Sequence, residues 1–192
     1  DIKSDRVATI NAGRCPIEGD EPGLANLLSD VVRSGRLCAT TDYSLLSSAD
    51  IILINVETPV DHLHQPNYHA LRAACRSLGL VMKDGVLVIV ESTIAPRTVD
   101  TVVRPILEET SGRRANEGFF LGACPERVMP GRLLANLRSM SRVCGGSTPE
   151  TARVMAALYR HIVQAALDPT DVVTAGLVKT TEHANRDVQI AC

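Results

Sequence analysis

The strongest constraint on the fold is a run of five apolar residues that leads directly into a polar cluster. Residues 86–90 read Val-Leu-Val-Ile-Val and are followed by Glu91, Ser92 and Thr93. A continuous apolar run rich in β-branched residues is typical of a strand that is buried on both faces of a parallel sheet. Ligands bind open α/β sheets at the carboxyl ends of such strands. The cluster is therefore either a ligand edge or a polar turn that only carries the chain out of the sheet.

Strand-like and helix-like segments alternate along the rest of the chain. Two further buried strands are expected at 50–56 and 119–124, and a short strand at 37–40. Helices are expected within 1–12 and at 21–34, 42–48, 67–81, 98–110, 149–164 and from 171 to the end. This order predicts an α/β fold of parallel βαβ units with right-handed crossovers. The three buried strands then end along one edge, in the turns Glu57-Thr58-Pro59, Glu91-Ser92-Thr93 and Pro125-Glu126-Arg127.

Composition argues against several classes of protein. The chain is 45% hydrophobic and 22% charged, as soluble globular proteins are, and its net charge of -2 gives no reason to expect nucleic acid or an acidic membrane as a partner. No apolar run reaches the roughly 18–20 residues of a membrane span, and the N-terminus does not read as a signal peptide. The six cysteines form no Cys-x-x-Cys pair and no His cluster joins them, so we expect no metal site and a reducing, cytoplasmic location.

The strand ends offer residues that suit a nucleotide. The hydroxyls of Thr58 and Thr93 could bind ribose and phosphate groups, and Pro59 directs the chain off the sheet. Glu126 could orient a water molecule or act as a base. Its alternative is a surface ion pair with Arg127, which the spacing favours equally.

The last helix carries a second candidate pair. Lys179 and His183 are four residues apart, so they share a helix face and could stabilise a developing alkoxide. A solvated polar stripe is the alternative. The Gly-x-Gly-x-x-Gly turn of dinucleotide-binding folds does not occur in the sequence. Asp1-Ile2 nevertheless matches the end of the second strand of such a fold, so we expect a sheet that lacks its first β-α-β segment.

Taken as a set, the motifs resemble the UDP-glucose/GDP-mannose dehydrogenase family over essentially the whole chain. The Pro-Glu-Arg-Val-x-Pro-Gly form is most similar to the branch that acts on UDP-N-acetyl sugars (N-acetylmannosamine or N-acetylglucosamine). The segments that carry the resemblance are Ile10-Asn11-Ala12-Gly13 with Pro16-Ile17, Thr40-Thr41-Asp42, Val56-Glu57-Thr58-Pro59, Glu91-Ser92-Thr93-Ile94, residues 124–132, Gly145-Gly146 and Val178-Lys179.

The resemblance implies an enzyme that oxidises the C6 alcohol of a UDP-sugar to a carboxylate with two NAD⁺, through intermediates held on a cysteine. It implies catalytic roles for Thr93, Glu126, Lys179 and His183, contacts to NAD from Asp1, Arg6, Val56, Thr58, Pro59 and Thr93, and contacts to the sugar nucleotide from Arg127, Val128, Met129, Pro130 and Gly131. It also implies a partial Rossmann-like NAD-binding domain at 1–165, the start of a central helical dimerisation domain at 166–192, a homodimeric full-length protein and a place in polysaccharide biosynthesis.

The sequence departs from the family pattern at several positions. His183 stands where the family has Asn, Arg97 where it has Gly and Gly176 where it has Glu. The glycine-rich motif of the nucleophilic cysteine and the C-terminal UDP-binding domain are absent, and Cys192 lies in the wrong context. We therefore expect an inactive fragment, prone to associate through its exposed sheet edge. Two alternatives stay open, a non-catalytic interaction or regulatory module and a hydroxyacid-type dehydrogenase, although the Pro-Glu-Arg-Val-Met-Pro-Gly loop argues against the latter.

Overall fold

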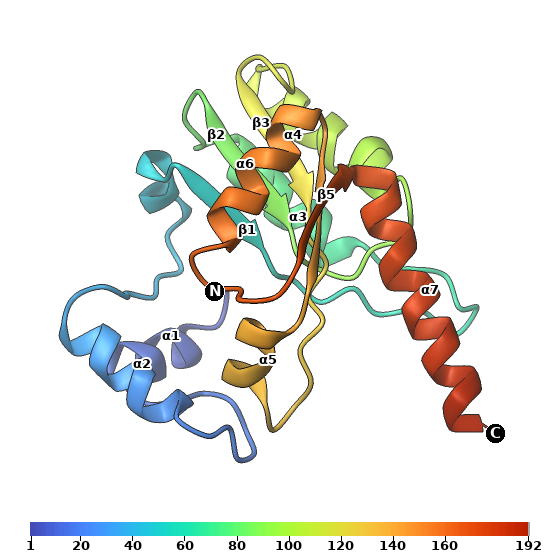
Figure 1. Ribbon diagram of the computed structural model, residues 1–192. Coiled ribbons are helices and arrows are strands. Elements are labelled where there is room, and N and C mark those ends of the chain that lie inside the picture. The colour runs from blue at the N-terminus through green and yellow to red at the C-terminus, as the bar shows by residue number, and fades with distance from the viewer. Residues whose placement is uncertain (192) are drawn as a thin grey trace.

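The computed structural model describes the backbone of residues 1–191 and the side chains apart from those of residues 183, 186, 187, 190 and 191 (Figure 1). The strands are β1 (Ile51–Ile54), β2 (Val86–Val90), β3 (Phe119–Ala123), β4 (Arg142–Gly146) and β5 (Leu167–Asp171). The helices are α1 (Ser4–Asn11), α2 (Leu24–Arg33), α3 (His69–Gly79), α4 (Arg104–Ser111), α5 (Leu133–Ser139), α6 (Pro149–Tyr159) and α7 (Val172–Ala191), with a 3₁₀ helix η1 (Tyr43–Ser48) and a π-helical turn η2 (Val99–Val103).

The five strands form one sheet in the order β1-β2-β3-β4-β5. The three predicted buried strands, β1 to β3, are parallel, which confirms the predicted α/β class. The sheet is mostly parallel, as predicted, and it departs from the parallel pattern only between β3 and β4, which are antiparallel, whereas β5 runs parallel to β4. The chain thereby reverses direction, so that α7 starts beside the Gly145-Gly146 end of β4 and runs on past the carboxyl end of β3 (Figure 1).

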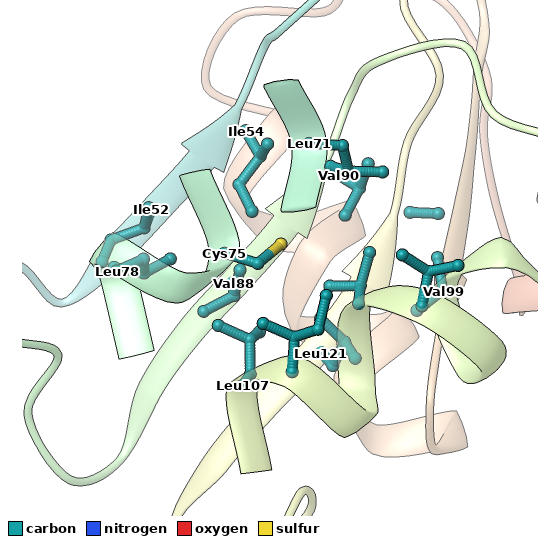
Figure 2. Packing of buried hydrophobic residues seen from close by; sticks show 14 of the residues in the cluster. Ile52, Ile54, Leu71, Cys75, Leu78, Val88, Val90, Val99, Leu107 and Leu121 are labelled. Atoms are coloured by element: carbon teal, nitrogen blue, oxygen red, sulfur yellow. The ribbon is translucent and has the colours of Figure 1, made fainter. Parts of the chain in front are cut away.

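The core lies on both sides of the central strands. On one face, α3, η2 and α4 cover the sheet, and Figure 2 shows Leu71, Cys75 and Leu107 from these helices gathered over Val88 and Leu121 of the strands. On the other face, α6 packs over β2 and β4 in a second buried cluster, whose members are Leu87, Ile89, Cys124, Cys144, Met155, Ala156, Tyr159 and Val163. Burial of this aliphatic surface stabilises the layers at roughly 25 cal/mol per Å².

The outer strand β1 is buried on one face only. Ile52 and Ile54 belong to the core, whereas Ile51 and Leu53 are 40% and 45% exposed. The prediction that this strand is buried on both faces was therefore wrong. The α6 layer covers β2 to β4, and every residue of α1 and α2 keeps some exposure to solvent. The outer face of β1 is consequently an apolar surface in contact with water.

The short strand predicted at 37–40 does not form. Residues 37–40 are coil, and the backbone N–H and C=O of Ala39 bond the side-chain amide of Asn11 instead of a neighbouring strand. The helix predicted at 98–110 is confirmed, but it opens with the π-helical turn η2. Pro105 accounts for that opening, because its ring lacks an N–H and crowds the carbonyl four residues earlier.

Candidate functional site

The carboxyl ends of β1 and β2 are held together by side-chain hydrogen bonds. The Ser92 hydroxyl accepts a hydrogen bond from the Val56 N–H at 2.8 Å and lies 2.7 Å from the Val56 carbonyl. The Thr58 hydroxyl donates to the carbonyl of Thr93 at 2.6 Å. The structure therefore brings Val56, Thr58 and Thr93 together, as a ligand edge requires. Ser92 is buried and maintains the backbone, whereas Thr93 is exposed to solvent.

Glu91, the first residue of the polar cluster, is a buried structural carboxylate. One of its oxygens accepts hydrogen bonds from the Tyr159 hydroxyl at 2.5 Å and from Arg142 at 3.3 Å. The other accepts a bond from the Asn55 amide at 2.9 Å. For Glu91 and Ser92 the reading as a polar turn is thus confirmed, and Thr93 is the member of the cluster that faces outward.

Arg142, at the start of β4, joins the two strand ends that carry Glu91 and Glu126. Its guanidinium bonds Glu91 and also Glu126, whose Oε2 lies 2.5 Å from Nη2, and it lies 5.0 Å from the centre of the Tyr159 ring. Burial on its own would lower the pKa of Arg142, but the negative charges of its neighbours, Glu126 foremost, outweigh it and raise the pKa. Arg142 is therefore a permanent cation within the protein.

Glu126 is held by three hydrogen bonds rather than by the surface ion pair considered above. Its Oε1 accepts the backbone N–H groups of Arg127 at 2.6 Å and Val128 at 2.9 Å, and its Oε2 accepts Arg142. The Arg127 side chain turns away to pair with Glu182 of α7 and to donate to the carbonyl of Ser141. The alternative of a Glu126–Arg127 surface pair was therefore wrong.

Lys179 lies on α7 and reaches the same edge. Its ammonium donates to the backbone carbonyl of Glu126 at 2.5 Å, and the residue is only 9% exposed. The close approach of α7 depends on Gly145 in β4, where an added Cβ would lie 2.6 Å from the Cβ of Ala175. His183 follows Lys179 by one helical turn, and its side chain lies outside the described residues.

The loop after Glu126 is tied to the segment that precedes α2. The N–H groups of Gly131 and Leu133 donate to the carboxylate of Glu21 at 2.5 and 2.9 Å. At its other end the loop is held by Glu126, and Met129 and Pro130, which lie between Glu126 and Gly131, are exposed to solvent. The predicted substrate loop is therefore fixed at both ends and open in the middle.

Asp1 and Arg6 lie together at the start of α1. The Asp1 carboxylate is 3.9 Å from the Arg6 guanidinium and accepts the N–H of Lys3 at 2.9 Å. The terminal amine of Asp1 donates to the carbonyl of Thr40 at 2.9 Å. Both side chains are open to solvent at this end of the chain.

The described residues contain neither a cluster suited to a metal ion nor a helix suited to span a membrane. Within them, no group of three or more His, Cys, Asp or Glu side chains is arranged to hold a metal ion. Among the described helices, none combines the length and the apolar character needed to cross a membrane.

Sequence reasoning missed Arg142, Tyr159 and Asn55. The signal for Arg142 was a charged residue immediately before the apolar pair Val143-Cys144, because a charge at the start of a buried strand requires a partner. The sequence did not show which carboxylates supply that partner.

Comparison with known proteins finds relatives along the whole chain. A family model described as "UDP-glucose/GDP-mannose dehydrogenase family, NAD binding domain" matches residues 1–163. UDP-N-acetyl-D-mannosamine dehydrogenase of Pyrococcus horikoshii is 37% identical over 191 residues, which cover 100% of this chain and 45% of the relative. UDP-N-acetyl-D-glucosamine 6-dehydrogenase of Pseudomonas aeruginosa is 33% identical over 192 residues, or 100% and 44% of the two chains. The chain thus spans less than half the length of these relatives.

Solved structures show the same fold. A UDP-D-ManNAc dehydrogenase structure from Pyrococcus horikoshii superposes with a TM-score of 0.94 at 36% identity, over 100% of this chain and 45% of that one. The ternary complex of GDP-mannose dehydrogenase from Pseudomonas aeruginosa gives a TM-score of 0.93 at 28% identity, over 99% and 44% of the two chains.

Proposed function

Because this chain belongs to the UDP-glucose/GDP-mannose dehydrogenase family, we propose that the protein it forms part of oxidises the C6 alcohol of a UDP-N-acetylhexosamine to the uronic acid. The matched region is the family's NAD-binding domain, so NAD is the cofactor. When bound, NAD accepts hydride from the sugar. The names of the two relatives above support a UDP-N-acetyl sugar as the substrate class.

The observation that carries the proposal is the contact between Lys179 and the Glu126 carbonyl. Two residues that are 53 positions apart, and that were predicted independently as catalytic, meet at the carboxyl edge of β3. An ammonium at this edge can stabilise negative charge on the C6 oxygen as its proton leaves. We assign this role to Lys179, with His183 as a second donor on the same helix.

Glu126 would orient water for the hydrolytic half of the reaction. A carboxylate accepts about four hydrogen bonds, and three are made within the chain by Arg142 and by the N–H groups of Arg127 and Val128. The remaining lone pair can hold one water molecule in a fixed direction. The three bonds keep the carboxylate in place.

The joined strand ends fit the nicotinamide half of NAD. We propose that Val56, Thr58, Pro59 and Thr93 line it, because the hydrogen bond from Thr58 to Thr93 fixes both hydroxyl-bearing residues at the edge. Asp1 would bind the adenosine ribose hydroxyls through its carboxylate, with Arg6 beside it.

The loop of Arg127, Val128, Met129, Pro130 and Gly131 would bind the sugar nucleotide. Its anchoring to Glu21 at one end and to Glu126 at the other supports a preformed binding loop. We assign 1–165 to a partial NAD-binding domain and 166–192 to the start of a central helical domain through which the full-length protein dimerises. These 192 residues contain neither a Gly-x-Gly-x-x-Gly turn nor a Gly-Gly-x-Cys motif, so we expect them to have no dehydrogenase activity on their own.

The deciding measurement is NADH formation from UDP-N-acetylmannosamine and UDP-N-acetylglucosamine, with the protein expressed from the full reading frame that contains these residues. Lys179→Met should reduce turnover by about a hundredfold or more, the scale of losing one oxyanion-stabilising donor. The matched control is Lys83→Met, which removes a surface cation paired with Asp50 and should leave turnover unchanged. Turnover that survives Lys179→Met, or clear NADH formation by the 192 residues alone, would contradict the proposal.

A further inference from the structure

Cys124 and Cys144 face each other across the junction of β3 and β4. The antiparallel register pairs Gly122 with Gly146 and Ala123 with Gly145. The next pair in this register is Cys124 and Cys144. Both side chains are fully buried in the cluster under α6, so they point to the same face of the sheet.

The backbone bonds define the geometry of this pair. The Cys124 N–H donates to the Val90 carbonyl, so the backbone groups of Cys124 face β2. The Arg142 N–H donates to the Ala166 carbonyl on the β5 side, and because alternate residues of a strand face the same neighbour, the backbone groups of Cys144 face β5 as well. The hydrogen bond from the Ser147 N–H to the Leu121 carbonyl agrees with this, because hydrogen-bonded and non-hydrogen-bonded pairs alternate along an antiparallel ladder. Cys124 and Cys144 are thus a non-hydrogen-bonded pair, with Cα atoms about 4.5 Å apart. That separation lies within the roughly 4.4–6.8 Å that a disulfide spans, near its short limit.

The surroundings differentiate the two thiols. The Cys144 thiol hydrogen bonds Cys124 and, together with the Arg142 guanidinium, lowers the pKa of Cys124 against the effect of burial. The same hydrogen bond and burial raise the pKa of Cys144. Cys124 is therefore the more acidic of the two thiols, which suits it to attack first, with Cys144 as the resolving partner.

We propose that Cys124 and Cys144 are a peroxide-sensitive dithiol that closes into a cross-strand disulfide. The Cys124 thiolate attacks one oxygen of hydrogen peroxide, the O–O bond breaks, and hydroxide leaves and takes up a proton to form water. The Cys144 sulfur then attacks the sulfenic acid on Cys124, the S–S bond forms, and a second water leaves with the Cys144 proton. The two sulfurs are oxidised and the two peroxide oxygens are reduced.

Peroxide is small and uncharged, which suits a buried pair. β3 and β4 are joined at only two register pairs within the described strands, and three of those four residues are glycine. Brief opening of this junction would admit a molecule the size of water. A disulfide closed at the short limit of Cα separation is strained and readily reduced again by thiols. The bond would fix the residue that precedes Pro125-Glu126 to the strand that carries Arg142.

The test is a peptide map of the folded 192-residue protein after treatment with hydrogen peroxide and alkylation in denaturant. Cys15, Cys38 and Cys192 are replaced by Ser beforehand. Cys75 remains as the matched control, because it is equally buried, its pKa is raised to about 12 by burial, and it has no described cysteine beside it. We expect a linked 124–144 peptide that is lighter by two hydrogen atoms and disappears on reduction, with Cys75 fully alkylated.

Cys144→Ala should stop the reaction at a sulfenic acid on Cys124, which a cyclic diketone traps. If that variant fails to fold, the map of the parent protein still decides the matter. The proposal is overturned if Cys124 and Cys144 both stay alkylatable after treatment, or if they link only when the protein is first unfolded in urea. Oxidation of Cys75 to the same extent would overturn it too, since burial alone would then explain the result.

Discussion

Replacing Arg142 by Met tests the central ion network of the site. The change removes the cation that pairs with both Glu91 and Glu126, whose side chains are 9% and 28% exposed. Met retains the apolar bulk of the stem over Tyr159, so the loss is mainly one of charge. Removing one member of a buried ion pair costs about 3–5 kcal/mol, because the other charge stays buried without its partner.

The magnitude should fall at the lower end of that range. Glu91 keeps the hydrogen bonds from Asn55 and Tyr159, and Glu126 keeps two backbone N–H donors and some contact with water. We expect the free energy of unfolding to fall by about 3 kcal/mol. With a urea dependence of about 3 kcal/mol per M for a chain of this size, the urea midpoint should fall by about 1 M.

The assay is urea unfolding followed by circular dichroism, with Arg153→Met as the matched control. Arg153 pairs with Glu150 on the outer face of α6, where both side chains are about two-thirds exposed, so its loss should change stability by less than about 0.5 kcal/mol. Adding Glu91→Gln to Arg142→Met should recover about 1 kcal/mol, because it removes the orphaned charge. Coincident midpoints for Arg142→Met and Arg153→Met would refute the reasoning.

Three further outcomes follow from local geometry. Arg97 has a positive φ of 70°, so Arg97→Gly should relieve about 1 kcal/mol of strain and raise Tm by about 2–4 °C, whereas a lower Tm would contradict this. Hydrogen bonds from the Thr174 hydroxyl and N–H lower the pKa of Asp171. The stability that the Asp171 carboxylate adds is present above its unfolded pKa and is lost as the pH falls through its folded pKa. Asp171→Asn should therefore flatten the decline of the urea midpoint below about pH 4. An unchanged slope of midpoint against pH would count against this prediction. Gly145→Ala would place a Cβ 2.6 Å from that of Ala175. The forced shift of α7 should lower the free energy of unfolding by about 1–3 kcal/mol, as measured by thermal unfolding, and an unchanged stability would contradict this.

The strands with strong apolar runs could be predicted from the sequence, and the others could not. β2 and β3 read as buried strands because Val, Ile, Leu and Phe dominate them. β4 reads Arg-Val-Cys-Gly-Gly and β5 reads Leu-Asp-Pro-Thr-Asp, compositions that favour turns. Both strands form because their neighbours supply hydrogen bonds and because α6 and α7 pack on them, which is tertiary information.

In the candidate site, too, some residues could be predicted from local sequence and others could not. The strand-end motifs identified Thr58, Thr93 and Glu126, since local sequence determines where a strand stops. The partner of these carboxylates could not be predicted from the sequence, because Arg142 is 16 residues from Glu126 and 51 from Glu91. Which cation reaches a buried carboxylate depends on strand order and direction, and the reversal at β4 was the feature that the sequence pattern did not reveal.

The narrow junction between β3 and β4 also bears on how the chain folds. On one side, β1 to β3 with α3 and α4 come from residues 51–123, and on the other, β4, β5, α6 and α7 come from residues 142–191. Each side is contiguous in sequence, so its contacts close short loops, which favours rapid formation. The two sides nevertheless share the buried cluster under α6 and the Arg142–Glu91 ion pair, so the amides of Ala123 and Gly145 should exchange only through an opening that also breaks these contacts, and therefore slowly in native-state hydrogen exchange.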